Sequence, residues 1–356
     1  MKKTIALILA LALCLCLFAG CGKEEPATPT TPATPAEPNA PTTDDPFSDG
    51  PTYNLNFSNG WSESLYYTAF ARERLLQLSE DTNGKVNIEF DGANALGSDA
   101  EVLEAVMMGD VAFIHVPSGS IIPYIPECGL LEMPMLFPDF KTANNICAQF
   151  EEEYMQSYYN EIGLTSLYSS CQDFRVLTNN KLIESYEDLA GNIVRNMQNK
   201  YTIEFWKACG AAPTYISGAE LAVALQQGVA DGQENPLYTV PAFAGIQKYV
   251  YDTNTTAYVD HLFVNTEIWE GMPAAYQDAI KEAFFDIRDY IIENHDAVNA
   301  EYIENIADYE MEYIEISDDM RAKMDAAKDS CYDLLREDIG DELIDAIFAM
   351  IDSYGK

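Results

Sequence analysis

The sequence predicts an α/β fold built on an open sheet in which neighbouring strands are largely parallel. The first observation behind this prediction is the order of elements after residue 51, where short strand-like runs alternate with amphipathic helix-like runs. The second is length, because about 305 residues follow that point, enough for two lobes or one large core.

The first half of this region has the order strand, helix, strand, helix, strand. We expect strands at 52–57, 86–90 and 111–114, and helices at 62–79 and 98–108. The second strand alternates apolar and polar residues, which is typical of a half-buried strand, whereas the third is an apolar run suited to a buried one. Ligands of open α/β sheets bind beyond the carboxyl ends of the strands, so this is where a site is expected.

The second half continues with further strands and one unusually long helix. We expect strands at 174–179, 193–195, 258–265 and 312–316, helices at 202–209 and from 273 to about 307, and two acidic helices at the end of the chain. At 1.5 Å per residue the long helix measures roughly 50 Å, which is more than one small lobe requires.

Residues 231–235, Asp-Gly-Gln-Glu-Asn, are predicted to form a polar turn between two helices. Apolar residues recur at helical spacing before this turn, and a helix to about residue 246 should follow it. Asn235 and Pro236 are typical of an N-cap followed by proline in the first helical position. A polar turn of this kind can hold a ligand, but residue type alone explains Asn235 equally well as a cap.

The first 20 residues are predicted to be a lipoprotein signal peptide. Two lysines precede an apolar run that is shorter than the roughly 20 residues a membrane-spanning helix needs. The run ends in Leu-Phe-Ala-Gly-Cys, which fits the site where bacterial lipoproteins are cleaved and lipidated. Cys21 is therefore expected to be the lipidated N-terminus, with an ordinary secretory signal as the alternative.

Residues 21–51 are expected to be a linker rich in proline and threonine. They contain eight prolines and almost nothing apolar enough to pack. About 30 residues of this composition reach roughly 90 Å when fully extended in the polyproline conformation. The chain is thus expected outside the cytoplasm, anchored by lipid to the outer face of the cell membrane, or in the periplasm.

Composition excludes several classes of function. The net charge of −38, from 20 Lys and Arg against 58 Asp and Glu, argues against nucleic-acid binding. The five cysteines after residue 21 lack CxxC spacing and are odd in number, so we expect mostly buried thiols, at least one of them unpaired, and neither a disulfide framework nor a metal site. No cofactor is expected, and no GxSxG, HExxH or P-loop pattern is present. A secreted hydrolase is the alternative from another class.

One segment resembles a known family. Residues 224–237, ALQQGVADGQENPL, closely match a signature of the solute-binding subunits of tripartite ATP-independent periplasmic (TRAP) transporters, dicarboxylate-binding type. Weaker matches occur in order along the chain, among them TNGKV at 82–86, PMLF at 134–137, RVLTN at 175–179 and EDLAGNIVR at 187–195. The resemblance covers nearly all of residues 53–265.

This resemblance implies a two-lobed, periplasmic-binding-protein-like (type II) fold with the long helix lying across both lobes. Lobe 1 would comprise 52–172 plus about 261–300, and lobe 2 would comprise 173–260 plus about 301–356. The chain would be a binding protein and not an enzyme. It would capture a small organic acid and deliver it to a membrane-embedded TRAP permease, although a receptor that presents its ligand to a sensor remains the alternative.

The resemblance also implies candidate ligand-binding residues in the second lobe. Arginine suits a carboxylate because its planar guanidinium donates two parallel hydrogen bonds. Arg195 matches the family's central carboxylate-binding arginine, with a surface arginine as the alternative, and Arg175 matches a more variable second contact. Asn235 corresponds to the signature asparagine, and Gln198 occupies a position where the family often has a polar contact.

Two candidates come from the first lobe. His115 and Ser118 follow the predicted strand 111–114 and are therefore expected near the carboxyl end of that strand, facing the cleft. For His115, however, residue type alone favours an ordinary packed or hydrogen-bonded histidine.

Overall fold

The structure is a computed structural model that describes residues 45–354, and all structural statements refer to these residues. The predicted signal peptide, Cys21 and the linker up to residue 44 lie outside them. The strands are β1 (Tyr53–Asn59), β2 (Val86–Asp91), β3 (Phe113–Pro117), β4 (Leu164–Asn179), β5 (Val194–Asn196), β6 (Thr214–Tyr215), β7 (Gly232–Pro236), β8 (Tyr249–Tyr251), β9 (Ala257–Asn265) and β10 (Glu312–Ile314).

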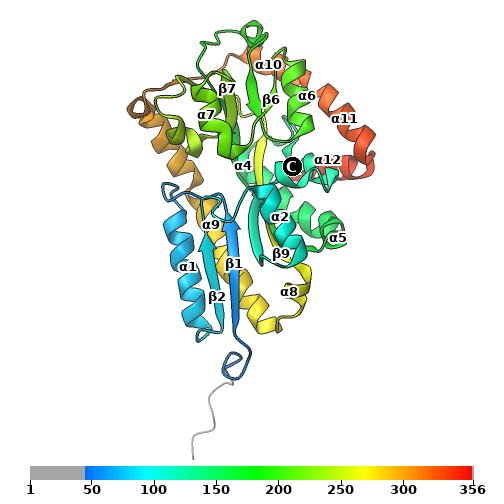
Figure 1. The fold of residues 1–356 in the computed structure, drawn as a ribbon. Coiled ribbons are helices and arrows are strands. Elements are labelled where there is room, and N and C mark those ends of the chain that lie inside the picture. Colours follow the sequence, from blue (N-terminus) through cyan, green and yellow to red (C-terminus); the bar gives the residue numbers. More distant parts are fainter. Residues whose placement is uncertain (1–44, 355–356) are drawn as a thin grey trace, which may run out of the picture. The chain divides into compact units, whose positions relative to one another are not determined.

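Helices pack on both sides of these strands (Figure 1). They are α1 (Thr68–Asp81), α2 (Asp99–Met108), α3 (Ser118–Ile121), α4 (Phe140–Phe150), α5 (Gln156–Glu161), α6 (Lys200–Ala208), α7 (Leu221–Gln226), α8 (Thr266–Glu270), α9 (Ala274–Glu304), α10 (Asp318–Ala327), α11 (Asp329–Ile339) and α12 (Glu342–Tyr354). The described chain thus ends in three helices where two were predicted.

The strands follow the order β2-β1-β3-β9-β4-β7-β5-β6, and β8 pairs with both β4 and β10. The prediction of parallel neighbours is confirmed for β1 with β2 and β3, and for β5 with β6 and β7. It is wrong in the middle of the sheet, where β9 is antiparallel to β3 and β4, and β4 is antiparallel to β7 and β8. The fold therefore consists of two parallel halves joined through antiparallel strands.

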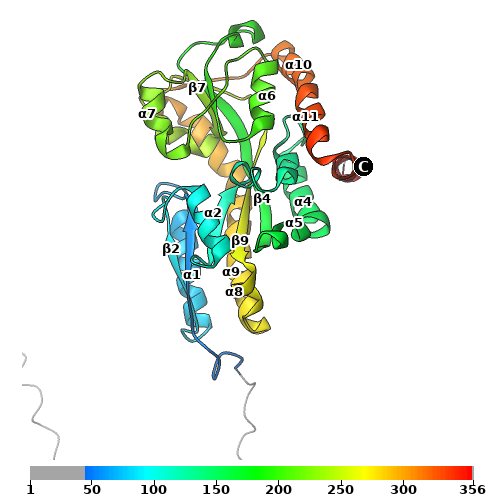
Figure 2. The ribbon, with the colours of Figure 1, turned by 45° about the vertical axis from the view of Figure 1, so that its right-hand side comes forward.

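Strand β4 connects the two halves (Figure 2). Its residues 164–174 pair with β9, whereas residues 175–179 pair with β7 and β8. The pairing changes partner between Phe174 and Arg175, next to a register shift between Cys171 and Asp173. The predicted strand 174–179 is thus only the last third of a 16-residue strand.

The predicted polar turn at 231–235 is wrong, because Gly232–Pro236 forms strand β7. This strand pairs with β4 on one side and β5 on the other, so its backbone hydrogen bonds are satisfied within the sheet. The Asn235 side chain does not cap the next element, which is a 3₁₀ helix at Leu237–Phe243 and not an α-helix to residue 246. A Cβ atom at Gly232 would overlap the carbonyl oxygen of Thr178 on β4, which explains the glycine.

The predicted long helix is confirmed as α9, 31 residues that begin after Pro273. Its buried residues pack with α1 and β1 in the first half, and its later turns contact the 3₁₀ helix Leu237–Phe243 of the second half. A single helix therefore contacts both halves. None of the helices within the described residues combines the length and apolar composition that a membrane crossing requires.

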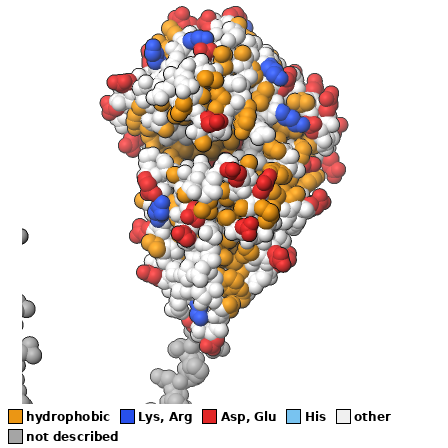
Figure 3. Space-filling model, in the orientation of Figure 1, with side chains coloured by type: hydrophobic (Ala, Val, Ile, Leu, Met, Phe, Trp, Pro, Cys, Tyr) orange, Lys and Arg blue, Asp and Glu red, His pale blue; other side chains and the backbone are white. Residues whose placement is uncertain are grey.

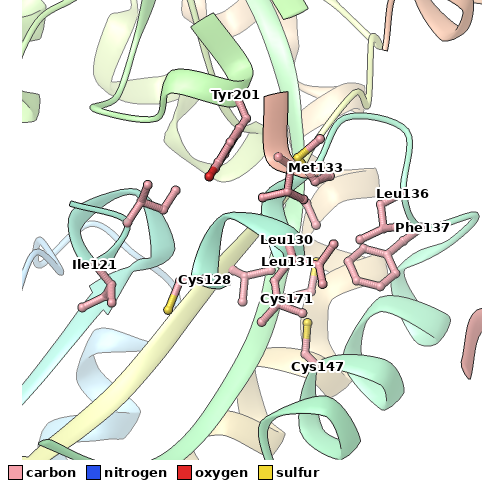
Figure 4. Close-up of a cluster of buried hydrophobic side chains, with 14 of the residues drawn as sticks. Ile121, Cys128, Leu130, Leu131, Met133, Leu136, Phe137, Cys147, Cys171 and Tyr201 are labelled. Carbon is pink, nitrogen blue, oxygen red and sulfur yellow. The ribbon is translucent and has the colours of Figure 1, made fainter. Parts of the chain in front are cut away.

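The larger of the apolar cores extends from the first half into the second. Figure 4 shows part of it, where the 3₁₀ helix Pro126–Glu132, α4, β4 and α6 meet. The five cysteines within the described residues are all buried, which confirms that part of the prediction, and none of them is in a disulfide; they are Cys128, Cys147, Cys171, Cys209 and Cys331. They fill apolar space in this core as small hydrophobic side chains do.

Candidate functional site

A cavity of about 330 Å³ lies where the carboxyl ends of β1, β3, β5 and β7 converge. Its walls come from both halves of the sheet and are formed by Gly60, Trp61, Leu65, Tyr67, Asn94, Asp99, His115, Pro117, Arg195, Met197, Gly218, Leu221, Asn235, Tyr238, Thr239, Phe243, Tyr258 and Asp260. This is the position that the βαβ order predicts for a ligand site. We refer to it below as the inner cavity.

A wider cavity of about 850 Å³ adjoins it and shares Asn94, Asp99, Arg195, Met197 and Gly218 with it. The remaining walls come from the start of α2, from residues 119–124 and from the segment 215–220. Figure 3 shows this face of the molecule hollowed between the level of α2 and that of α7 and β6. We call this the outer cavity, and the exposed Gln198 lies on it instead of the inner one.

Arg195 on β5 lines both cavities, although its side chain is almost completely buried. Its Nε donates to the carbonyl oxygen of Ile216 at 2.7 Å, which fixes the guanidinium. Within the described residues it has no ion pair, whereas the other six of the seven arginines each pair with Asp or Glu. Burial, and then the charge of Arg175, lower the pKa of Arg195 to about 10, so it remains a cation at neutral pH.

Arg175 on β4 is buried behind the wall of the inner cavity and does not line it. Its Nη2 donates to Oε1 of Glu132 at 3.2 Å, and its guanidinium lies 4.5 Å from the ring centre of Tyr258. Burial opposes its charge, but the carboxylates of Glu132 and Glu234 outweigh this effect and raise the pKa of Arg175. Its charge is thus already matched inside the protein, in contrast to that of Arg195.

Asn235 on β7 lines the inner cavity, and its side chain lies between this cavity and Arg175. Its Oδ1 accepts from Nη1 of Arg175 at 3.4 Å, and its Nδ2 donates to Oε1 of Gln233 at 2.6 Å. Gln233 in turn donates to Oγ1 of Thr178 at 3.0 Å. An amide nitrogen has two N–H groups, so one remains for a partner in the cavity.

His115 on β3 lines the inner cavity beside Asp260 on β9. Its Nδ1 lies 3.6 Å from Oδ2 of Asp260, and its ring meets Trp61 edge to face at 4.7 Å between centres. Burial, and then the neighbouring His261, lower the pKa of His115 to about 3, so the ring is neutral at neutral pH. Nε2 of His115 and Oδ1 of Asp260 are buried without a hydrogen-bond partner among the described residues.

Ser118 lines neither cavity, so the expectation that it faces the cleft is not met. Its Oγ lies 2.8 Å from Nε2 of His261, and Nδ1 of His261 lies 3.5 Å from Oε2 of Glu151. This order of hydroxyl, imidazole and carboxylate occurs in hydrolases. Here all three side chains are buried in the core and line none of the cavities described here, so the arrangement is a structural network.

The sequence reasoning missed the aromatic and acidic walls of the inner cavity. Trp61, Tyr67, Tyr238 and Tyr258 supply the aromatic surface, and Asp99 and Asp260 supply the acids. Asp260 had a detectable signal, because with His261 it interrupts the apolar residues of the buried strand β9. A charged residue at such a position usually has a partner or a function.

Another hollow, of about 690 Å³, lies between residues 135–140 and α10. Its arginine, Arg321, is ion-paired with Asp252 and donates to the carbonyl oxygens of Asp252 and Thr253. This hollow therefore offers no free cation to an anionic ligand.

The described residues contain no cluster of three or more His, Cys, Asp or Glu side chains suited to a metal ion.

A two-lobed α/β fold with a cavity of small-molecule size between its lobes, lined by a buried cation that has no ion pair among residues 45–354, defines a ligand-binding protein. The chain belongs to family 7 of the bacterial extracellular solute-binding proteins, whose sequence model matches residues 57–338. The resemblance to TRAP solute-binding subunits is thereby confirmed. Proteins of this family bind substrates for transport, in agreement with the prediction that the chain is not an enzyme.

The similarity extends to individual proteins. A solute-binding protein of Verminephrobacter eiseniae is 28% identical over 233 residues, which cover 65% of this chain and 68% of that protein. The C4-dicarboxylate-binding periplasmic protein DctP of Rhodobacter capsulatus is 25% identical over 273 residues, covering 75% and 82%. The sugar acid binding protein of Advenella mimigardefordensis, solved with galactonate, superimposes with a TM-score of 0.80 at 23% identity and covers 86% of this chain and 99% of its own. This last match supports the fold alone.

Proposed function

We propose that the protein captures a small organic acid by binding its carboxylate to Arg195 in the inner cavity. The observation that supports this proposal is the unpaired charge of Arg195, buried between walls from both halves of the sheet. The two Nη groups remain for two parallel hydrogen bonds to a carboxylate, since Nε is occupied by Ile216. A bound anion would offset the loss of hydration that lowers the pKa of Arg195.

The other candidates take different roles in this proposal. Asn235 would donate its second N–H to the ligand, and Arg175 would hold Asn235 in position without touching the ligand itself. Gln198 would contact the ligand only on its way through the outer cavity. His115 would accept or donate one hydrogen bond through its unpartnered Nε2. We propose no ligand contact for Ser118.

We also propose that the two lobes close on the ligand by a hinge motion. The lobes would comprise residues 52–172 plus about 261–300, and 173–260 plus about 301–356. The change of pairing partner between Phe174 and Arg175 lies within three residues of this boundary, which supports it. Hinges commonly lie where a few residues at the end of an element change conformation.

The proposed location follows from the sequence beyond the described residues. Residues 1–20 would be the lipoprotein signal peptide, Cys21 the lipidated residue and 21–51 the tether to the outer face of the membrane. The loaded protein would then deliver its ligand to a TRAP-type permease in the same membrane. A Cys21→Ser chain released from membranes into the soluble fraction would support the anchor, and an unchanged distribution would contradict it.

A thermal-shift screen of the purified protein tests the proposed binding. The panel should contain small carboxylic acids and their uncharged amides, and a binder at a hundredfold excess over its Kd adds about 2.7 kcal/mol to the free energy of unfolding. We expect shifts from carboxylates only, lost in Arg195→Ala and retained in Arg336→Ala, which removes an exposed arginine of α11. Equal shifts in wild type and Arg195→Ala would refute the role of Arg195.

A further inference from the structure

We propose that the ligand is a monocarboxylic acid that also carries a protonated amine, with the ammonium group held beside Asp260 and Asp99. This inference rests on the proposed function, because it takes the carboxylate on Arg195 as given. It narrows the class of ligand to zwitterions such as amino acids, and it disfavours dicarboxylic acids.

The first argument is the balance of charge around the inner cavity. Its walls contain one side chain that is cationic at neutral pH, Arg195, besides the neutral His115, and two acidic side chains, Asp99 and Asp260. The charge of Arg175 behind the wall is already matched by Glu132 and Glu234. A bound dicarboxylate would therefore place four acidic groups around one unmatched cation. A zwitterion adds no net charge and supplies the missing cation.

The second argument is the state of Asp260. Its side chain is 5% exposed, and Oδ1 has no hydrogen-bond partner among the described residues. Its neighbour His115 is neutral, so no cation among the described residues forms an ion pair with Asp260 at neutral pH, and Arg175 acts on it only as a more distant charge. Burial, and then the charges of Glu132 and Asp99, raise the pKa of Asp260 well above its usual range. An ammonium group in the cavity would supply both the hydrogen bond and the opposing charge.

Asp99 is the second acidic side chain of the inner cavity, and it lies on the side that adjoins the outer cavity. It is the first residue of α2, it accepts a hydrogen bond from Oγ of Ser120 at 3.1 Å, and it lines both cavities. Burial raises the pKa of this carboxyl group as well. An ammonium entering through the outer cavity would therefore meet Asp99 before it reaches Asp260.

The third argument is the aromatic surface. The rings of Trp61 and Tyr67 meet edge to face at 5.0 Å between centres, and those of Tyr67 and Tyr238 at 6.1 Å. Tyr258 completes this surface on the side of Arg175. Aromatic faces attract ammonium groups and offer nothing comparable to a second carboxylate. Charge balance, the unpartnered acid and the aromatic walls thus favour the same class of ligand.

Matched pairs of ligands test the inference. Calorimetry on the purified protein should compare L-alanine with L-lactate, L-phenylalanine with L-3-phenyllactate and L-aspartate with L-malate, and should include succinate. Each pair differs only by an amino group in place of a hydroxyl group. We expect at least one amino member to bind, at least tenfold more tightly than its hydroxy partner, and succinate to bind more weakly than either.

Two variants locate the effect. Asp260→Asn and Asp99→Asn keep the size of the side chain and remove its charge, and we expect Asp260→Asn to abolish most of the tenfold preference for the amino member. Glu151→Gln is the matched control, because Glu151 is a buried acid that lines neither cavity, and it should retain the preference. A preference that survives in both aspartate variants would overturn the assignment of these residues.

The outcomes separate this inference from the proposed function. If hydroxy acids or succinate bind as well as the amino acids, and Arg195→Ala abolishes their binding, the inference fails and the proposed function stands. If no acid binds, or Arg195→Ala binds as wild type does, the proposed function fails and the inference fails with it.

Discussion

Arg175 and Glu132 form an ion pair, 3.2 Å from Nη2 to Oε1, in which both side chains are almost completely buried. The second oxygen of Glu132 accepts from Nδ2 of Asn199 at 3.2 Å, so the carboxylate joins β4 to the segment before α6. Arg195, two strands away in the sheet, has no such partner among the described residues. The two arginines thus differ: the charge of Arg175 is matched within the protein, and Arg195 is the one proposed to bind the ligand.

The first prediction concerns the stability of this pair. Glu132→Gln leaves a buried guanidinium without its nearest counter-charge, and breaking such a pair costs about 3–5 kcal/mol. We expect a loss of that size in the free energy of unfolding by urea, and a smaller loss in the double variant with Arg175→Met. A single-variant loss below about 1 kcal/mol would show that Glu234 alone compensates Arg175.

The second prediction concerns Gly232 on β7. A Cβ atom at this position would overlap the carbonyl oxygen of Thr178 and crowd the side chain of Asn179, so the two strands must separate to admit it. We expect Gly232→Ala to lower the free energy of unfolding by about 1–3 kcal/mol. Gly218→Ala is the control, since a Cβ there meets nothing within 4 Å, and equal losses in both variants would contradict the explanation.

The third prediction concerns pH and His295 on α9. Burial opposes protonation of this ring, but hydrogen bonds and charges from Asp173 and Asp296 outweigh it and raise the pKa of His295. A base with a raised pKa in the folded state stabilises the fold below its unfolded pKa of about 6.5 and loses this contribution as the pH rises through the folded pKa. We therefore expect His295→Gln to cost more stability at pH 6 than at pH 9, measured by urea unfolding.

His115 provides a control of opposite sign for that experiment. Its pKa is lowered to about 3, so below about pH 6.5 the unfolded chain takes up a proton that the folded protein does not. Wild type should then lose stability relative to His115→Gln as the pH falls toward 5. If the free energy of unfolding of both histidine variants changed with pH in the same direction relative to wild type, neither ion pairing nor burial of the rings would explain the pH dependence.

The fourth prediction concerns the rate of binding. The chain has a net charge of −38, which repels an anionic ligand at long range, and salt screens this repulsion beyond about 10 Å at 0.1 M. The association rate of an anionic acid should therefore rise as salt is added, whereas that of a zwitterion should stay nearly constant. Stopped-flow fluorescence can follow both, because Trp61 lines the inner cavity. An anion that binds more slowly at higher salt would contradict this.

The parts of the fold that the sequence predicts are those with a clear periodicity. Strands β1 and β2, helix α2 and the long helix α9 occur close to where expected, whereas β3 begins two residues after the predicted start of its apolar run and α1 begins six residues after its predicted start. The first two thirds of β4 were missed, because the strand carries Ser166, Ser169 and Ser170 at buried positions and shows no alternation. Its polar groups are satisfied by contacts that only the folded chain provides, such as Ser169 with the carbonyl oxygen of Cys147.

The segment 231–235 was predicted as a turn but forms a strand, although its residues carry a clear local signal. Its Asp, Gly and Asn are residues of turns, but pairing with β4 and β5 outweighs their local preference. The residues of the candidate site also fall into those that the sequence indicated and those that only the folded structure reveals. Arg195 and Asn235 were found because they lie in one stretch of motifs, whereas Trp61 and Asp260 reach the cavity from elements about 200 residues apart.

Strands β9 and β4 lie side by side between the two halves of the sheet, β9 paired with β3 and β4 with β7, and helix α9 contacts elements of both halves. Each proposed lobe is therefore assembled from two separate stretches of sequence, and no single cut in the gene yields one lobe intact. Ribosomal synthesis completes the first lobe only when the residues after about 261 have emerged. Assembly of the two lobes is in this sense interdependent, and a nonsense mutation anywhere before α9 removes parts of both.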